Sequence, residues 1–209
     1  MRGSVAAGIV LAGAAWQGSP APDERYLTWT MEQVESVGRT AYKTGRVGGF
    51  FNTRLLKTER SYNYKLAATW LTPEVIRATA RMLQVRSRLD REEARKLVEE
   101  AEQIADAVFI IEIDPREGSG VIPHDWEAFL QPKARPEAAV RGTLNQKLRG
   151  VRALAGVLRR NYDYDRFWVT FPLSDAGSPV FTAQDRTAEL VVRIYDKEGR
   201  VEWPLAARQ

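Results

Sequence analysis

Apolar and polar residues alternate along residues 60–71 and 166–173, which predicts two β-strands with one buried face each. In the second of these strands Phe167, Val169 and Phe171 share a face. Residues 107–113 are apolar at almost every position, which predicts a central strand that is covered on both faces.

The C-terminal segment predicts a β-hairpin, because alternate residues from Ala188 to Ile194 are apolar and a polar turn and a second strand follow. A turn of four residues would place Ile194 opposite Val201 and Arg193 opposite Glu202. Apolar side chains would then meet on the inner face and opposite charges on the outer face. We expect this register, because a slip of one residue would exchange the two faces.

Three helices are predicted from apolar residues spaced three and four apart, over residues 30–45, 73–87 and 91–105. Each follows a capping residue, which is Thr30, Thr72 or Asp90. Residues 148–160 fit a helix or a strand, and the alternation there favours a strand.

Residues 115–147 contain four prolines and little periodicity, so that they predict only a short strand at 129–131. Together the elements predict an α+β fold, namely an antiparallel β-sandwich or curved sheet with an inserted helical hairpin and an N-terminal helix. The chain of 209 residues is long enough for a single domain over residues 23–209.

The first 22 residues predict an export signal and a spacer. Arg2 precedes a run of small and apolar residues from Val5 to Ala15, which ends in a small-x-small cleavage pattern and a Pro-rich spacer. We expect the mature chain to begin between Ala15 and Asp23, and the protein to be periplasmic or secreted. The alternative is an Ala-rich start of a cytosolic protein. The run is too short to span a bilayer, which takes about 20 apolar residues.

Composition narrows the chemistry that the chain can perform. The absence of Cys excludes disulfides, thiolate nucleophiles and Zn–Cys sites. His124 is the one histidine, so that a His-based acid or base could lie only there. A formal charge of +4 without a cluster of basic residues does not predict nucleic-acid binding. We expect no cofactor, no metal and no nucleic-acid partner.

Two pairs of acidic residues are candidates for chemistry. Glu112 and Asp114 lie two residues apart at a strand end, where two carboxyl groups could act in glycoside hydrolysis. A strand-end charge and a turn-opening Asp-Pro are the favoured interpretation. Asp163 and Asp165 could hold Ca²⁺, although Arg166 beside them is the favoured partner.

An arginine line and an aromatic face are the candidate binding surfaces. Arg77, Arg81 and Arg88 lie on one line of the second helix and could contact an anionic surface, although a Glu-rich helix follows and favours ion pairing instead.

The strand at 166–173 has a second face, opposite the inward one. Alternation places Trp168 on it, together with Arg166, Tyr164 and Tyr162 at the alternate positions before Trp168. An open face of this kind could bind a sugar or an apolar side chain. The usual burial of Trp and Tyr favours a covered face.

The sequence therefore predicts an exported, non-catalytic β-rich module that binds a protein or a glycan of the cell envelope. Two alternatives remain open at this point. The first is a glycan hydrolase that depends on carboxylates such as Glu112 and Asp114, and the second is a purely structural envelope protein.

Overall fold

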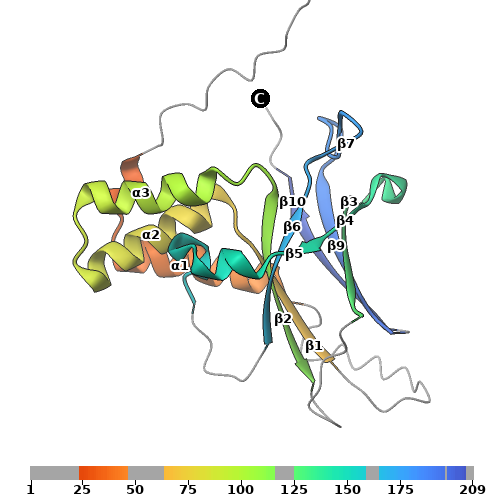
Figure 1. The fold of residues 1–209 in the computed structure, drawn as a ribbon, viewed down its shortest axis with the longest axis horizontal. Helices are drawn as coiled ribbons and strands as arrows, with labels where there is room; N and C mark the ends of the chain where they lie inside the picture. The colour runs from red at the N-terminus through yellow and green to blue at the C-terminus, as the bar shows by residue number, and fades with distance from the viewer. Residues whose placement is uncertain (1–23, 47–63, 116–124, 159–164, 196, 206–209) are drawn as a thin grey trace, which may run out of the picture.

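The structure is a computed structural model, and it describes residues 24–46, 64–115, 125–158, 165–195 and 197–205. Figure 1 shows three layers, which are a helical layer, a middle sheet and an outer sheet. The elements in chain order are η1 (Glu24–Thr28), α1 (Met31–Thr44), β1 (Tyr64–Trp70), α2 (Pro73–Ser87), α3 (Arg91–Glu102), β2 (Ala107–Pro115), β3 (Glu127–Pro132), η2 (Pro136–Ala138), β4 (Val140–Arg141), β5 (Thr143–Leu144), η3 (Gln146–Gly150), η4 (Arg152–Ala155), β6 (Asp165–Phe171), β7 (Ser174–Asp175), β8 (Ser178–Pro179), β9 (Thr187–Ile194) and β10 (Lys197–Pro204).

Two four-stranded antiparallel sheets of the described chain form the sandwich. Sheet A has the strand order β1-β2-β6-β5, and sheet B has the order β10-β9-β3-β4. The helical hairpin of α2 and α3 is inserted between β1 and β2, and α1 precedes the first strand. The predicted α+β class, with its antiparallel sheets, inserted hairpin and N-terminal helix, is confirmed.

The main core lies between the two sheets. Phe109 of the central strand β2 stacks on Trp70 at 5.1 Å between ring centroids. It also makes edge contacts with Phe171 and with Trp203 of sheet B. Ile110 points to the other side of β2 and packs against the helical layer. The prediction that residues 107–113 form a strand covered on both faces is confirmed.

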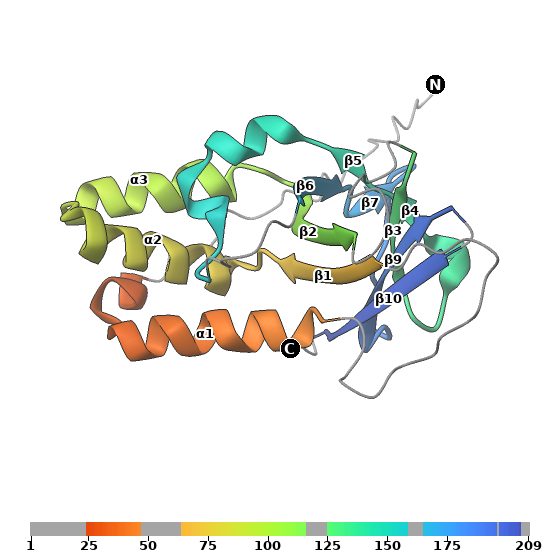
Figure 2. The ribbon, with the colours of Figure 1, turned by 90° about the horizontal axis from the view of Figure 1, so that it is seen from below.

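The helical layer covers the other face of sheet A, as Figure 2 shows from below. Thr30 and Asp90 each form the predicted capping box, and Thr72 caps α2. These caps satisfy backbone N–H groups that a helix start leaves without partners. Among the described residues, none of the helices has the length and the apolar composition that crossing a bilayer requires.

The C-terminal hairpin forms, but with a shorter turn than the sequence predicts. Only two residues separate the strands, and Ile194 pairs with Lys197. Tyr195 adopts a left-handed conformation with φ 55°, as such tight turns demand. Val201 therefore lies opposite Leu190, so the predicted pairing of Val201 with Ile194 is wrong. The difference is four residues, an even number, which changes every pair while leaving each side chain on its predicted face.

Two further segments test the predictions for the middle of the chain. The short strand predicted at 129–131 is confirmed as part of β3, whereas the strand favoured at 148–160 is wrong. The 3-10 helices η3 and η4 lie there instead, and they bury Leu148, Ala153 and Leu154 against the helical layer. The apolar residues therefore face the core from helical turns. In so short a segment the sequence pattern of a helix cannot be distinguished from that of a strand.

Gly142 joins the two sheets. β4 belongs to sheet B and β5 to sheet A, so the chain crosses between them at this residue. A Cβ at Gly142 would lie 2.6 Å from side-chain atoms of Phe171 and Val169. Glycine is needed here because the backbone passes directly over the edge of the core.

Candidate functional site

Trp168 does not lie on an open face, which agrees with the covered face that the sequence favours for it. Trp168 is buried in the helix-facing core of sheet A, and its indole N–H donates a hydrogen bond to the Leu154 carbonyl at 3.0 Å. η4 covers the ring, so that the residue fills the core. Tyr162 and Tyr164 lie outside the described residues.

Arg166 and Glu112 are brought together by strand register. They lie directly opposite each other on β6 and β2, and the Arg166 Nε donates to a Glu112 carboxylate oxygen at 2.9 Å. The Glu112 side chain is only 5% exposed. Glu112 is therefore a buried ion-pair partner of Arg166, and Asp163, one of the two aspartates expected to pair with Arg166, lies outside the described residues.

A small cavity adjoins this ion pair on the helix-facing side of sheet A. It measures about 20 Å³, and Gly38 and Tyr42 of α1 and Thr69 of β1 contribute to its wall. That volume holds about one water molecule and no sugar ring. Asp114 follows Glu112 by two residues in β2, so both belong to the same face of the strand. The structure does not describe the side chain of Asp114.

The arginines of the predicted anionic-surface contact are distributed over three environments. Arg77 pairs with Glu102 of α3 at 3.0 Å. Arg81 donates to the Trp29 carbonyl at 3.0 Å and to Gln84 at 2.8 Å. Arg88 is exposed in a left-handed conformation at the end of α2. The first two are thus engaged within the helical layer.

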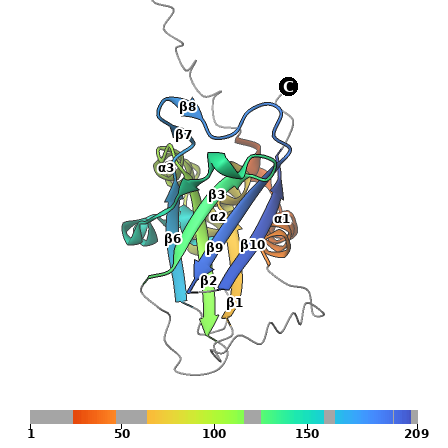
Figure 3. The ribbon, with the colours of Figure 1, turned by 90° about the vertical axis from the view of Figure 1, so that its right-hand side faces the viewer.

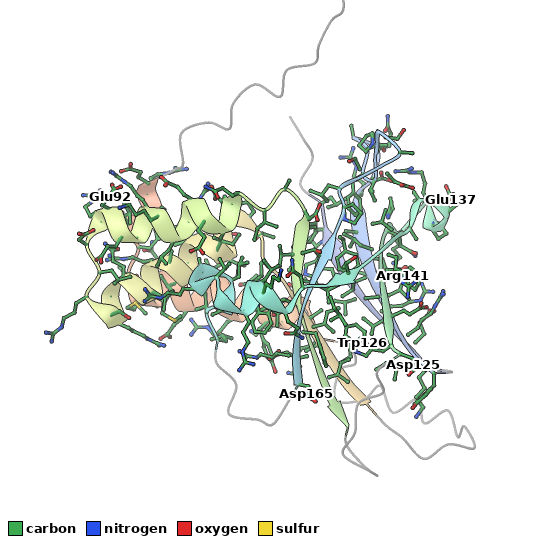
Figure 4. The ribbon with its side chains drawn as sticks, in the orientation of Figure 1. Glu92, Asp125, Trp126, Glu137, Arg141 and Asp165 are labelled. Carbon is green, nitrogen blue, oxygen red and sulfur yellow. The ribbon has the colours of Figure 1, made fainter. Side chains whose placement is uncertain are left out.

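The candidate metal ligands are not assembled among the described residues. No three His, Asp or Glu side chains of the described ranges converge in a way that could hold an ion. Asp125 and Asp165, both labelled in Figure 4, are exposed near strand ends. His124 and Asp163 lie outside the described residues.

The outer side of sheet B faces away from the helical layer, and Figure 3 shows it facing the viewer with the helices behind it. We call this surface the sheet B face. Its side chains alternate with those that point into the core between the sheets. It consists of Glu127, Phe129, Gln131, Lys133, Arg141, Glu189, Val191, Arg193, Glu198, Arg200 and Glu202.

Strand register arranges the sheet B face in rows. In the central row Arg141, Phe129, Val191 and Arg200 follow one another across the four strands. Two apolar residues therefore occupy the middle of the row, and an arginine stands at each end. Figure 4 shows Arg141 on the side of sheet B that points away from the helical layer.

Ion pairs cross the sheet B face from strand to strand. Arg141 pairs with Glu127 at 2.7 Å, and Arg200 pairs with Glu189 at 2.7 Å. Arg193 donates to Glu198 at 2.9 Å, and this hydrogen bond is the main reason why the pKa of Glu198 is below its ordinary value. These contacts hold the long side chains in defined positions.

Glu189 is the most buried charge of the sheet B face. Its carboxylate accepts hydrogen bonds from Gln131 at 2.7 Å and from Arg200 at 2.7 Å, and its side chain is 6% exposed. A buried carboxylate is costly unless it is paired in this way. The pair therefore fixes Arg200 above the strands and helps to order the face.

The sequence predicts part of this surface and misses the rest. The alternation of β9 places Arg193 on the outer face. Arg141 lies in the stretch 115–147, which has no periodicity that could have revealed it. Its place follows from the pairing of β4 with β3, which is a contact between segments that no local pattern specifies.

Comparisons with known proteins give no relative for this chain. No protein-family model, no curated protein and no solved structure matches it.

Proposed function

We propose that the protein is an exported, non-catalytic module that binds a protein or a glycan of the cell envelope, and that the partner docks on the sheet B face. Export follows from the pattern of the first 22 residues. The binding role is supported by one observation above all, which is that the outer side of sheet B carries three exposed arginines, each paired with a glutamate, together with the partly exposed Phe129.

The order of this surface favours binding in two ways. The buried carboxylate of Glu189 holds Arg200 before a partner arrives, which reduces the entropy that association would cost. Arginine and aromatic residues are also enriched in protein interfaces relative to other surfaces. Phe129 and the three arginines of the sheet B face belong to these residue types.

The test is capture of envelope components by the purified full-length chain. We would immobilise wild-type protein and two variants, Arg141→Glu on the sheet B face and Arg39→Glu on α1. Both arginines are exposed and pair with a glutamate, so the two changes are matched in charge and setting.

The captured material would be separated into detergent-soluble envelope proteins and protease-treated polysaccharide. We expect wild type and Arg39→Glu to retain one of the two fractions, and Arg141→Glu to lose most of it. Equal retention by all three proteins would show that binding does not use the sheet B face. Retention of neither fraction by wild type would contradict the proposed function.

A further inference from the structure

The charges of the sheet B face are layered. In each of its described ion pairs the cation extends further into solvent than the carboxylate. Arg141 is 70% exposed against 38% for Glu127, and Arg193 is 53% exposed against 32% for Glu198. Arg200 is 49% exposed above the buried Glu189. A partner that approaches sheet B therefore meets guanidinium groups first.

This layering distinguishes sheet B from the helical layer. There Arg77 and Arg95 are less exposed than the glutamates with which they pair, while Arg39 and Arg91 are more exposed than theirs. The mixed order leaves no uniform outer charge. On sheet B the cation is the more exposed partner in every described pair.

The aromatic ring of the sheet B face is already covered on one side. The Arg193 guanidinium carbon lies 5.1 Å from the centroid of the Phe129 ring, in a cation–π contact. A sugar would have to displace this guanidinium in order to stack on that side of the ring. A carboxylate would instead accept hydrogen bonds from the guanidinium, which has five donors in a planar fork.

The spacing of the arginines fits an extended peptide. Arg141 and Arg200 lie at the two ends of the central row, three strands apart, and neighbouring strands are about 4.8 Å apart. Their Cα atoms are therefore about 14 Å apart. Side chains four residues apart in an extended segment span about the same distance, at about 3.4 Å per residue.

We propose that the sheet B face binds an extended, acidic segment of a partner protein, whose carboxylates accept hydrogen bonds from Arg141, Arg193 and Arg200. Phe129 is the partly exposed apolar residue of the interface, and Val191 lies buried beneath the face. The proposal rests on the proposed function and names the chemistry of the partner, which is an acidic protein and not a glycan.

The experiment measures binding of fluorescently labelled poly-L-glutamate to the full-length chain by anisotropy, at low and at physiological salt. The test variant is Arg141→Gln/Arg193→Gln, and the matched control is Arg39→Gln/Arg91→Gln on the helical layer. Both double variants remove two paired, exposed arginines. We expect the Kd of the test variant to rise at least tenfold and that of the control to stay within about twofold of wild type.

Thermal melts show whether each variant is folded. If the loss of the Arg193 guanidinium from the Phe129 ring prevents folding, the single variant Arg141→Gln replaces the double variant. An equal rise in Kd for test and control variants would overturn the proposal, because attraction would then depend on net charge alone. Tighter binding of polygalacturonate than of poly-L-glutamate would assign the face to an acidic glycan.

The two proposals fail in different ways. If Arg141→Glu abolishes envelope capture while poly-L-glutamate does not bind to wild type, the acidic peptide is excluded and the binding role stands. If wild type captures no envelope component, the binding role itself is contradicted.

Discussion

Trp168 and Asp185 are single residues that connect segments distant in the sequence. Trp168 of β6 reaches η4 through its indole N–H, as described above. The Asp185 carboxylate accepts hydrogen bonds from Arg135, at 2.6 Å and 3.2 Å, and from the backbone N–H and hydroxyl of Thr182. Each residue thereby fixes a loop that has little regular structure of its own.

Replacing Trp168 tests its role in the core. Trp168→Ala should lower the free energy of unfolding by about 3–5 kcal/mol, because it empties a large buried volume. Trp168→Phe should cost less, about 1–3 kcal/mol, mainly through the unpaired carbonyl of Leu154. Urea denaturation of both variants gives these values. A loss below about 1 kcal/mol for Trp168→Ala would show that the ring is not buried.

Asp185 makes folding stability depend on acid pH. The hydrogen bond from Arg135 lowers the pKa of Asp185 well below its ordinary value, despite the opposing effect of burial. The stabilisation is therefore complete above the unfolded-state pKa of about 3.9, and it is lost as the pH falls below about 4 toward the folded-state pKa.

Comparison with Asp185→Asn isolates this effect. At pH 7 the variant should be less stable than wild type by about 1–3 kcal/mol. In urea melts between pH 7 and pH 2.5 the difference should stay constant down to about pH 4 and then shrink. A difference that is independent of pH would contradict the role of the Arg135–Asp185 pair.

At the scale of elements, α1 and β1 are joined with almost no space between them. The Gly45 carbonyl accepts a hydrogen bond from the Ala68 N–H at 2.8 Å. A Cβ on Gly45 would lie 1.5 Å from the carbonyl oxygen of Ala68, so that the backbone of one element would have to move away from the other. This contact sets the position of the end of α1 on the edge of sheet A.

Gly45→Ala should therefore lower the free energy of unfolding by about 1–3 kcal/mol or more, since overpacking usually costs that much. Gly150→Ala is the matched control, because no atom lies within 4 Å of a Cβ at that position. Its effect should stay within about 0.5 kcal/mol. Thermal melts of the two variants give the comparison, and equal stability would mean that α1 does not contact β1 so closely.

At the scale of the whole molecule, the two faces of the sandwich differ in what covers them. Helices and 3-10 helices cover sheet A, and the sheet B face is covered among the described residues only by its own long side chains. The N-terminal end of the described chain belongs to the covered side. Tyr26 and Leu27 are buried there, and Glu24 pairs with Arg95 at 2.9 Å.

This arrangement limits where an export signal could be removed. Cleavage between Ala15 and Asp23 would leave the buried Tyr26 in place, so that the mature chain would keep its helical core. N-terminal sequencing of protein isolated from its native host should give a start in that range. Protein that retains Met1 in the cytosol would contradict export.

Removal of the buried residues themselves provides the structural control. A chain that begins at Glu24 should melt at a temperature close to that of the full-length protein. A chain that begins at Trp29 lacks the side chains of Tyr26 and Leu27 and should be less stable by several kcal/mol, because two buried side chains are lost. Circular dichroism melts of the two truncated chains measure this difference.

The sequence by itself determined the features that depend on neighbouring residues. The capping boxes at Thr30 and Asp90 and the shared face of Val169 and Phe171 in β6 each depend on a few positions, so that a local pattern predicts them correctly. The burial of the opposite face of β6 as well depends on tertiary packing. The continuous apolar run of β2 likewise predicted a strand covered on both faces, since this arrangement removes both sets of side chains from water.

Contacts between distant segments decided the rest, and these follow from the free energy of packing the whole chain. The hairpin could shift by four residues without moving any side chain to the other face, so only the packed sheets select the pairing of Val201 with Leu190. η4 covers Trp168, and Glu112 pairs with Arg166, because tertiary packing brings those segments together. The sheet B face likewise exists only once β4 pairs with β3 and places Arg141 beside residues that are distant in the sequence.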